Sequence, residues 1–208
     1  MSSVEPAHQR TVAAFDFDGT LSTRDNFFPF VCLVAGRLRT ARAVLSTAPL
    51  IVAAALRDGR RNTAKGALVR RTFAGRAVED VEAVAEDFAD AVVRAHLRDE
   101  AVERAEWHRR QGHEVVIVSA SLEIYLRPIA DRLGFDAVLG TALEADADGR
   151  LTGRLAGANV RRAEKARRLD AWLAGTPAFV WAYGDSKGDH ELFERADRAI
   201  RVGRRARR

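Results

Sequence analysis

Short apolar runs, most of them ended by a glycine or a polar residue, alternate along the chain with segments of helical periodicity. Five runs predict buried strands, at residues 11–15, 113–118, 137–140, 178–183 and 199–202. The first run is short, apolar and ends at Asp16, as is typical of a buried parallel strand. Helical patterns between most of the runs predict an α/β fold with a doubly wound, mostly parallel, Rossmann-like sheet.

Two of the intervening helices have clear end signals. The first is expected over residues 121–133, with Ser121 as its cap, and the second over about 160–174, with Asn159 as its cap. Glycines follow both segments, as is common after helix ends.

The segment between the first two strands is far longer than an ordinary crossover. It shows only helical periodicity, most clearly on the helix face formed by Val81, Val84, Ala85, Phe88 and Val92. We therefore expect a helical cap domain at residues 22–112, with its last helix assignable to either unit. Residues 1–21 and 113–203 would form the core domain, and residues 204–208 a basic tail.

Residues 143–155 are expected to form a hairpin with its turn at Asp148-Gly149. The acidic spacing there imitates the start of a calcium loop. However, the twelfth position is Leu155 rather than Glu and neither flank is helical, so we do not expect calcium.

Composition adds little to this outline. Hydrophobic residues make up 47% and charged residues 30% of the 208 residues, as in ordinary globular proteins. The net charge of +5 comes from the last eight residues, which hold five arginines and no acid; the remaining 29 basic residues equal the 29 acidic ones. We expect this tail to be a solvated end rather than a nucleic-acid site, since no aromatic platform accompanies it.

Neither a membrane segment nor a disulfide is expected. The start of the chain lacks the apolar stretch of a secretory signal, and the longest apolar run, residues 48–56 (APLIVAAAL), is too short to span a bilayer. It reads as a packed or interfacial helix. Cys32 is the only cysteine, which fits a reduced, cytoplasmic setting.

Candidate chemistry lies directly after the predicted strands. Asp16 and Asp18 follow the first strand, with Gly19 allowing a sharp turn, and Asp185 and Asp189 follow the fourth. Carboxylates packed this closely repel one another, and Mg²⁺, which prefers oxygen ligands, would relieve the repulsion. Each pair alone could also be a polar loop or complement a helix dipole.

Two further residues gain meaning only from this context. Ser119 ends the second strand, where its hydroxyl and the Ala120 amide could bind an anion or simply cap a helix. Lys165 lies on the helix before the fourth strand, a position where lysine is usually a solvated charge.

Together these clusters resemble the four ordered motifs of haloacid dehalogenase (HAD) phosphatases. The matching segments are DFDGTL after the first strand, the strand-end Ser119, Lys165, and Gly184-Asp185-Ser186 followed by Asp189. The helical insert, with the phrases WHRRQGHEVVIVSAS and YGDSKGDHEL, looks like the phosphoserine phosphatase-like branch, subfamily IB.

The resemblance implies a Mg²⁺-dependent phosphatase acting on a small-molecule phosphate monoester. Asp16 would be the nucleophile that becomes an aspartyl-phosphate, and Asp18 the acid and base. The Mg²⁺ ligands would be Asp16, the Asp18 carbonyl and Asp185, with Asp189 in support.

The same resemblance implies that phosphoryl oxygens are bound around Gly19, Thr20, Ser119, Ala120 and Lys165. In phosphoserine phosphatases a Glu nine residues after the nucleophile and a cap Arg read the amino acid. Here the first position is Asp25, and Arg70 and Arg71 are candidates for the arginine.

Alternatives remain open at this point. The same phosphoenzyme could pass its phosphoryl group to an alcohol or sugar, or the fold could be a non-enzymatic nucleic-acid binder that uses the arginine tail. A serine hydrolase is disfavoured because Ser119 lacks a Gly-x-Ser-x-Gly elbow. Dehalogenation is disfavoured by the second acid, Asp18, and the full metal motif.

Overall fold

A five-stranded parallel sheet forms the centre of the molecule, seen in a computed structural model that describes residues 10–36 and 61–203. The strands are β1 (Thr11–Phe15), β2 (Glu114–Leu122), β3 (Ala137–Thr141), β6 (Phe179–Gly184) and β7 (Arg198–Arg201). They are ordered β3-β2-β1-β6-β7, and every neighbouring pair is parallel. The predicted doubly wound α/β fold is therefore confirmed, with β1 between β2 and β6.

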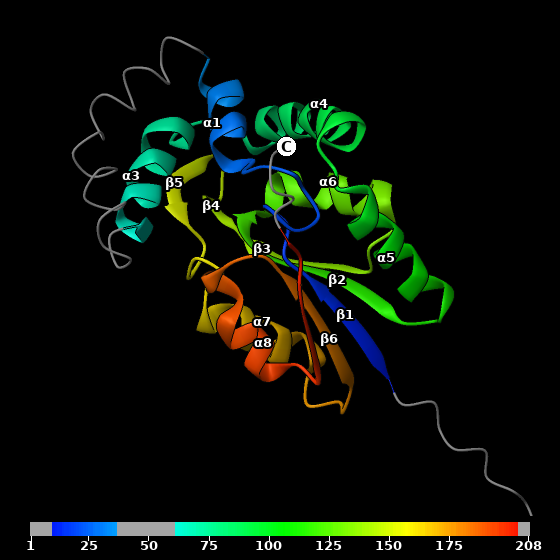
Figure 1. The fold of residues 1–208 in the computed structure, drawn as a ribbon. Helices are drawn as coiled ribbons and strands as arrows, with labels where there is room; N and C mark the ends of the chain where they lie inside the picture. Colours follow the sequence, from blue (N-terminus) through cyan, green and yellow to red (C-terminus); the bar gives the residue numbers. More distant parts are fainter. Residues whose placement is uncertain (1–9, 37–60, 204–208) are drawn as a thin grey trace, which may run out of the picture.

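The two faces of the sheet support two separate hydrophobic cores, because successive strand residues point to opposite sides. Ala13 and Phe15 pack into one core, whereas Val12 and Ala14 pack into the other. The helices α5 (Asp99–Arg110) and α6 (Glu123–Leu133) cover the first face, and α7 (Ala163–Leu173) and α8 (His190–Arg195) cover the second (Figure 1).

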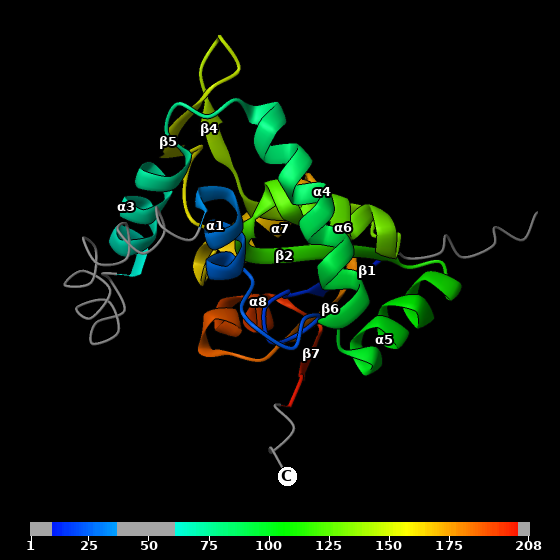
Figure 2. The same cartoon turned by 90° about the horizontal axis from the view of Figure 1, so that it is seen from above.

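The described part of the long insert after β1 is helical, as predicted. Its helices are α1 (Phe27–Ala35), α3 (Arg61–Phe73) and α4 (Val78–Ala95), followed by α5. On α4 the expected face is buried at Val81, Ala85, Phe88 and Val92, and Val84 is partly buried. This face packs toward α6, so the insert rests on one side of the sheet while α1 and α3 extend beyond its end (Figure 2).

The hairpin of β4 (Leu143–Ala145) and β5 (Leu151–Leu155) joins the insert although it lies far away in the sequence. Gly75 donates its N–H to Leu151 O at 2.8 Å, and the Leu151 N–H donates to Arg76 O at 2.8 Å. A Cβ at Gly153 would lie 2.8 Å from Ala74 Cβ and 2.9 Å from Arg70 Cα, so glycine lets the hairpin reach the α3 backbone. α3 is thus held by a segment from the second half of the chain.

The predicted caps of two helices are wrong, because each of these side chains binds a residue outside its helix. α6 begins at Glu123, and Ser121 lies in the extended end of β2. α7 begins at Ala163 after Arg162, while the Asn159 Oδ1 accepts from Lys65 Nζ at 2.7 Å. Both polar side chains bind across the structure rather than to their own helix, which a local cap rule does not foresee.

A buried histidine packs against one face of the sheet at β1 and β6. His108 of α5 is fully buried, its Nε2 is 2.8 Å from the Tyr183 hydroxyl, and its Nδ1 is 2.8 Å from His113 Nδ1. Tyr183 stacks on Phe15 with ring centroids 4.3 Å apart. Burial, followed by the nearby His113 and Arg104, lowers the pKa of His108 to about 4, so the ring is neutral at pH 7.

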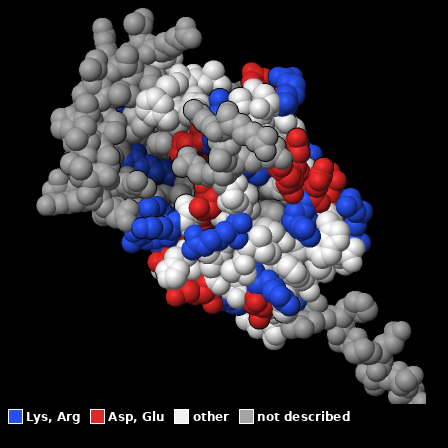
Figure 3. Space-filling view, viewed as in Figure 1, with Lys and Arg blue, Asp and Glu red and all other residues white. Residues whose placement is uncertain are grey.

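Several predicted features lie outside the described residues, namely the start of the chain, the apolar run at 48–56 and the tail at 204–208. None of the helices in the described part of the chain has the length and hydropathy of a membrane span. On the face shown in Figure 3, basic and acidic side chains are interspersed, and neither sign covers the described part of that face.

Candidate active site

Polar residues that follow β1 and β6, and others in the last part of β2, meet at one edge of the sheet. Asp16 follows β1 and donates its N–H to Tyr183 O at 2.8 Å, which ties it to β6. A cavity of about 970 Å³ opens at this edge. Its lining includes Asp16, Asp18, Gly19, Asp25, Arg98, Ser119, Ala120, Lys165 and Asp185. Segments more than 160 residues apart in the chain therefore share one site, as open α/β sheets favour at the carboxyl ends of their strands.

Lys165 reaches this site from α7 and is not a solvated charge. Its Nζ lies 2.6 Å from Asp16 Oδ1 and 2.5 Å from Asp189 Oδ1, and all three side chains are buried. Burial alone would lower the pKa of Lys165, but the charges of Asp16 and Asp189 outweigh it and raise that pKa. Burial raises the pKa of Asp16, and Lys165 opposes the rise. One ammonium thus lies between two carboxylates that would otherwise repel each other.

Asp189 is fixed from its other side by the loop that carries it. Its Oδ2 accepts from Ser186 N at 3.0 Å and from Ser186 Oγ at 2.9 Å, while Gly188 N donates to Ser186 Oγ at 3.1 Å. A Cβ at Gly184 would lie 2.7 Å from Asp189 Cγ, so the glycine at the end of β6 makes room for the carboxylate. Asp189 is therefore held as a partner of Lys165.

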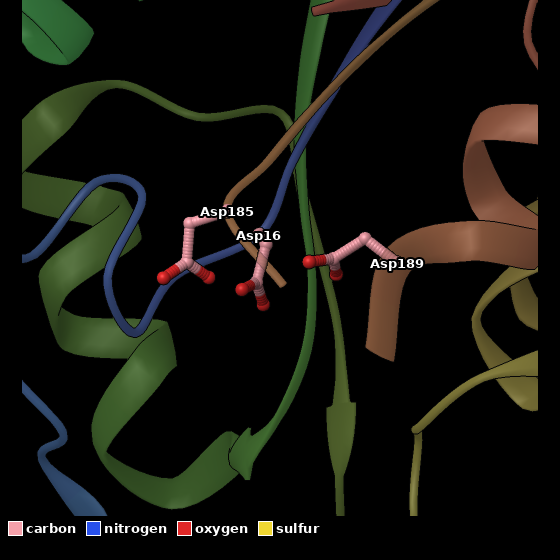
Figure 4. A group of neighbouring side chains, drawn as sticks. All are labelled: Asp16, Asp185 and Asp189. Carbon is pink, nitrogen blue, oxygen red and sulfur yellow. The ribbon is translucent and has the colours of Figure 1, made fainter. Parts of the chain in front are cut away.

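Asp185 approaches the turn after β1 closely. Gly19 has φ +84°, and a Cβ there would lie 2.3 Å from Asp185 Oδ2. One carboxylate oxygen from each of Asp16, Asp185 and Asp189 lies within 4.8 Å of the other two, and Asp16 is in the middle of the group (Figure 4). Three hard oxygen donors at this spacing fit a small divalent cation such as Mg²⁺. Both oxygens of Asp189 already accept hydrogen bonds, Oδ1 from Lys165 and Oδ2 from Ser186, so Asp16 and Asp185 are the better suited direct ligands.

Asp18 is held by three donors. Asn26 N and Nδ2 donate to its Oδ1 at 3.0 and 2.9 Å, and the Ser121 hydroxyl donates to its Oδ2. Burial, assisted by the negative charge of Asp25, raises the pKa of Asp18 to about 7, against the opposing hydrogen bonds from Ser121 and Asn26. A carboxyl group poised near neutrality can give and take a proton, which is the requirement for acid and base chemistry.

The end of β2 lies beside Asp18, and the pairing of β2 with β3 is irregular between Val118 and Leu122. Ser119 and Ala120, in this part of β2, line the cavity, and the Ser121 N–H donates to Ser119 Oγ at 3.3 Å. The Ala120 carbonyl accepts from Thr141 Oγ1 at 3.0 Å and from Lys65 Nζ. These contacts hold the end of β2 in place beside the cavity.

Thr20 is placed differently from the implied phosphate-binding role. Its side chain is fully buried, does not line the cavity, and its hydroxyl finds no hydrogen-bond partner among the described residues. The neighbouring Gly19 does line the cavity.

Of the three residues predicted to determine specificity, only Asp25 lies at the cavity. Asp25 lines the cavity, and its Oδ1 accepts from Phe27 N at 3.1 Å at the start of α1. Arg70 and Arg71 are exposed on α3 and are not part of the cavity wall, so the structure does not bring them to the site. Arg98, between α4 and α5, does line it and donates to Gly19 O at 3.1 Å and Thr20 O at 3.2 Å.

Lys65 is a residue near the site that the sequence analysis missed. It extends from α3 to the core, where it contacts the Ala120 carbonyl and Asn159 and lies 5.2 Å from the centre of the Phe27 ring. Burial lowers its pKa to about 7, with Asp18 and Asp25 opposing the shift. A signal was present in the sequence, because lysine occurs only three times among the 34 basic residues, at Lys65, Lys165 and Lys187.

Comparisons with known proteins identify the family and the fold. Residues 13–194 match the model of the haloacid dehalogenase-like hydrolases. Protein CicA from Caulobacter vibrioides is 38% identical over 193 residues, which are 93% of this chain and 86% of that protein. A phosphoserine phosphatase from Archaeoglobus fulgidus is 34% identical over 51% of this chain and 32% of its own. A solved substrate-bound phosphoserine phosphatase shares the fold, with a TM-score of 0.65 and 21% identity over 94% of this chain and 87% of that one.

Proposed function

The chain belongs to the haloacid dehalogenase-like hydrolases, in the phosphoserine phosphatase-like group, and on this basis we propose that it hydrolyses a small-molecule phosphate monoester with Asp16 as the nucleophile. The observation that carries the proposal is the buried Lys165 ammonium, 2.6 Å from Asp16, in a cavity that also contains Asp18 and Asp185. A carboxylate nucleophile needs nearby positive charge, because both it and the phosphate are anions.

Mg²⁺ fits the carboxylates of Asp16 and Asp185, with Asp189 supporting the site through Lys165. When bound, the cation would offset the charge of the two carboxylates and of the phosphoryl oxygens. Lys165 and the Ser119–Ala120 segment of β2 are proposed to bind the phosphoryl oxygens. Both come from rigid elements, so they would be in place before the substrate arrives.

The reaction follows in two steps. An Asp16 oxygen bonds to phosphorus as the bond to the leaving oxygen breaks, and Asp18 gives that oxygen its proton. Water then attacks the phosphorus of the aspartyl-phosphate, Asp18 takes up the water's proton, and inorganic phosphate and free Asp16 result. The raised pKa of Asp18, about 7, suits a group that must be acid in one step and base in the next.

The substrate is proposed to be a phosphorylated metabolite that carries further charged groups. Arg24, Asp25, Arg98, Asp99 and Glu100 line the cavity opposite the strand ends and place both signs of charge where a leaving group would lie. Phosphoserine or a related amino-acid phosphate fits such a mixed wall. Asp25 lies nine residues after Asp16, where phosphoserine phosphatases carry a Glu that reads the amino acid.

The test is release of inorganic phosphate from p-nitrophenyl phosphate and a panel of monoesters that includes phosphoserine, with Mg²⁺ or with EDTA. We expect turnover by the wild type only with Mg²⁺, no turnover by Asp16→Asn, and phosphate on the peptide containing Asp16 after acid quench. Asp170→Asn is the matched control, because this exposed residue on α7 pairs with Arg195 away from the cavity.

An Asp16→Asn protein with the wild-type rate would refute the assignment of the nucleophile. Adding glycerol or a sugar as acceptor separates hydrolysis from the alternative phosphotransfer. Transfer would appear as a phosphorylated acceptor in place of inorganic phosphate.

A further inference from the structure

Ser121 contacts two groups of the proposed reaction at once. Its N–H donates to Ser119 Oγ at 3.3 Å, and its hydroxyl donates to Asp18 Oδ2. The residue is 2% exposed, lies in the extended end of β2, and is not part of the cavity wall. Ser121 therefore cannot act by touching the substrate, and any effect on the reaction must pass through Asp18, Ser119 or the neighbouring Tyr125.

The two oxygens of Asp18 have different kinds of partner. Oδ1 accepts from the backbone N–H and the side-chain amide of Asn26, and both groups can only donate. Oδ1 must therefore stay an acceptor whether or not Asp18 carries a proton. The Ser121 hydroxyl at Oδ2 can donate to a carboxylate and can equally accept from a carboxylic acid after rotation about its C–O bond.

From this asymmetry we infer that Ser121 is a positioning residue for Asp18, and that Oδ2 is the oxygen that exchanges a proton with the leaving group. The inference rests on the proposed phosphatase function. In the first step the Asp16–phosphorus bond forms, the phosphorus–oxygen bond breaks, and the Oδ2 proton moves to the departing oxygen. The Ser121 hydroxyl then donates to the charged Oδ2. In the second step a water oxygen bonds to phosphorus, the bond between phosphorus and the Asp16 oxygen breaks, and a water proton moves to Oδ2.

The backbone half of the link supports Ser119. An N–H donated to Ser119 Oγ occupies a lone pair and leaves the hydroxyl proton for a phosphoryl oxygen. This bond survives any change of the Ser121 side chain, whereas the bond to Asp18 does not. Ser121→Ala therefore separates the two halves of the link and tests only the one to Asp18.

The experiment compares two leaving groups. p-Nitrophenolate departs readily without a proton, whereas an alkoxide requires one, so only the alkyl ester depends on the acid. In Mg²⁺ we expect Ser121→Ala to lower kcat/KM about 10- to 100-fold for the alkyl phosphate that the wild type hydrolyses best, and less than about threefold for p-nitrophenyl phosphate. The ratio kcat/KM covers the steps up to departure of the leaving group, so slow hydrolysis of the phosphoenzyme does not obscure the comparison.

Two further variants serve as controls. Thr141→Val removes a hydroxyl that binds the Ala120 carbonyl, Asn159 Oδ1 and Val160 N. It loosens the same end of β2 without touching Asp18, so both substrates should lose the same factor. Ser121→Cys keeps a small side chain with a weak donor and should give an intermediate difference between the substrates. If Ser121→Ala does not fold, judged by its thermal melt, the cysteine variant decides the question.

An equal loss for both substrates, or no loss for either, would overturn the role of Ser121 while leaving the phosphatase proposal intact. A wild type that releases no phosphate from any monoester would instead refute the proposed function.

Discussion

Replacing Lys165 with methionine should destabilise the protein strongly. The ammonium lies 2.6 Å from Asp16 and 2.5 Å from Asp189, and methionine has a similar length but no charge. Two buried carboxylates would then face each other without compensation. Breaking a buried ion pair in this way costs about 3–5 kcal/mol. For a domain of this size each kcal/mol shifts the Tm by roughly 2–4 °C, so we expect the Tm to fall by roughly 6–20 °C.

The assay is thermal unfolding followed by circular dichroism at pH 7 in EDTA. Lys187→Met is the matched control, because Lys187 is exposed in the neighbouring loop and its loss should change stability by less than about 0.5 kcal/mol. Asp189→Asn added to Lys165→Met removes one of the stranded charges and should recover part of the loss. A double-mutant cycle with the two single variants then gives the coupling, which we expect at about 0.5–3 kcal/mol.

Mg²⁺ provides a second readout. It should raise the Tm of Lys165→Met more than that of the wild type, because a bound cation would offset the stranded carboxylates. If Lys165→Met melts at the wild-type temperature in EDTA, Lys165 does not compensate buried charge. The electrostatic account of this site would then be wrong.

Two other predictions concern single residues. Gly19→Ala places a Cβ 2.3 Å from Asp185 Oδ2 at φ +84°, so a Mg²⁺ titration of phosphatase activity should show a lower maximal rate and a higher half-saturating concentration; a wild-type curve would contradict this account. The pKa of His108, about 4, lies below the ordinary 6.5, so the ring is neutral in the folded state. Its contribution to the free energy of unfolding is therefore complete above pH 6.5 and falls by up to about 3 kcal/mol as the pH drops to 4. Urea unfolding at several pH values should therefore show a flatter dependence for His108→Gln than for the wild type, and parallel curves would exclude the role of this ring.

The sequence predicted the central strands well because the burial of β1 and β2 on both faces leaves a local signature. Runs such as Thr11–Phe15 need no knowledge of distant residues, and the helix face of α4 is equally local in origin. Polar residues were harder to place, because their partners lie far away in the chain. Ser121 and Asn159 were predicted to be helix caps. In the folded chain Ser121 binds Asp18 and Asn159 binds Lys65, and both partners are distant in the sequence.

The charged residues of the insert were also hard to place from the sequence alone. Arg70 and Arg71 were chosen by rough position in the chain, but helix α3 turns them outward. The same helix turns Lys65 inward to the Ala120 carbonyl. The rarity of lysine in this arginine-rich chain would have been a better guide, since two of its three lysines are buried or partly buried beside the cavity.

The attachment of the β4–β5 hairpin to α3 matters for anyone who builds chimeras in this family. Exchanging residues 22–112 with those of a relative would leave Gly153 and the Leu151 backbone facing a foreign helix. A transplant that keeps specificity and folding should therefore carry residues 143–155 as well. Helix α3 and the hairpin are one unit in space, but two separate stretches of the chain form it.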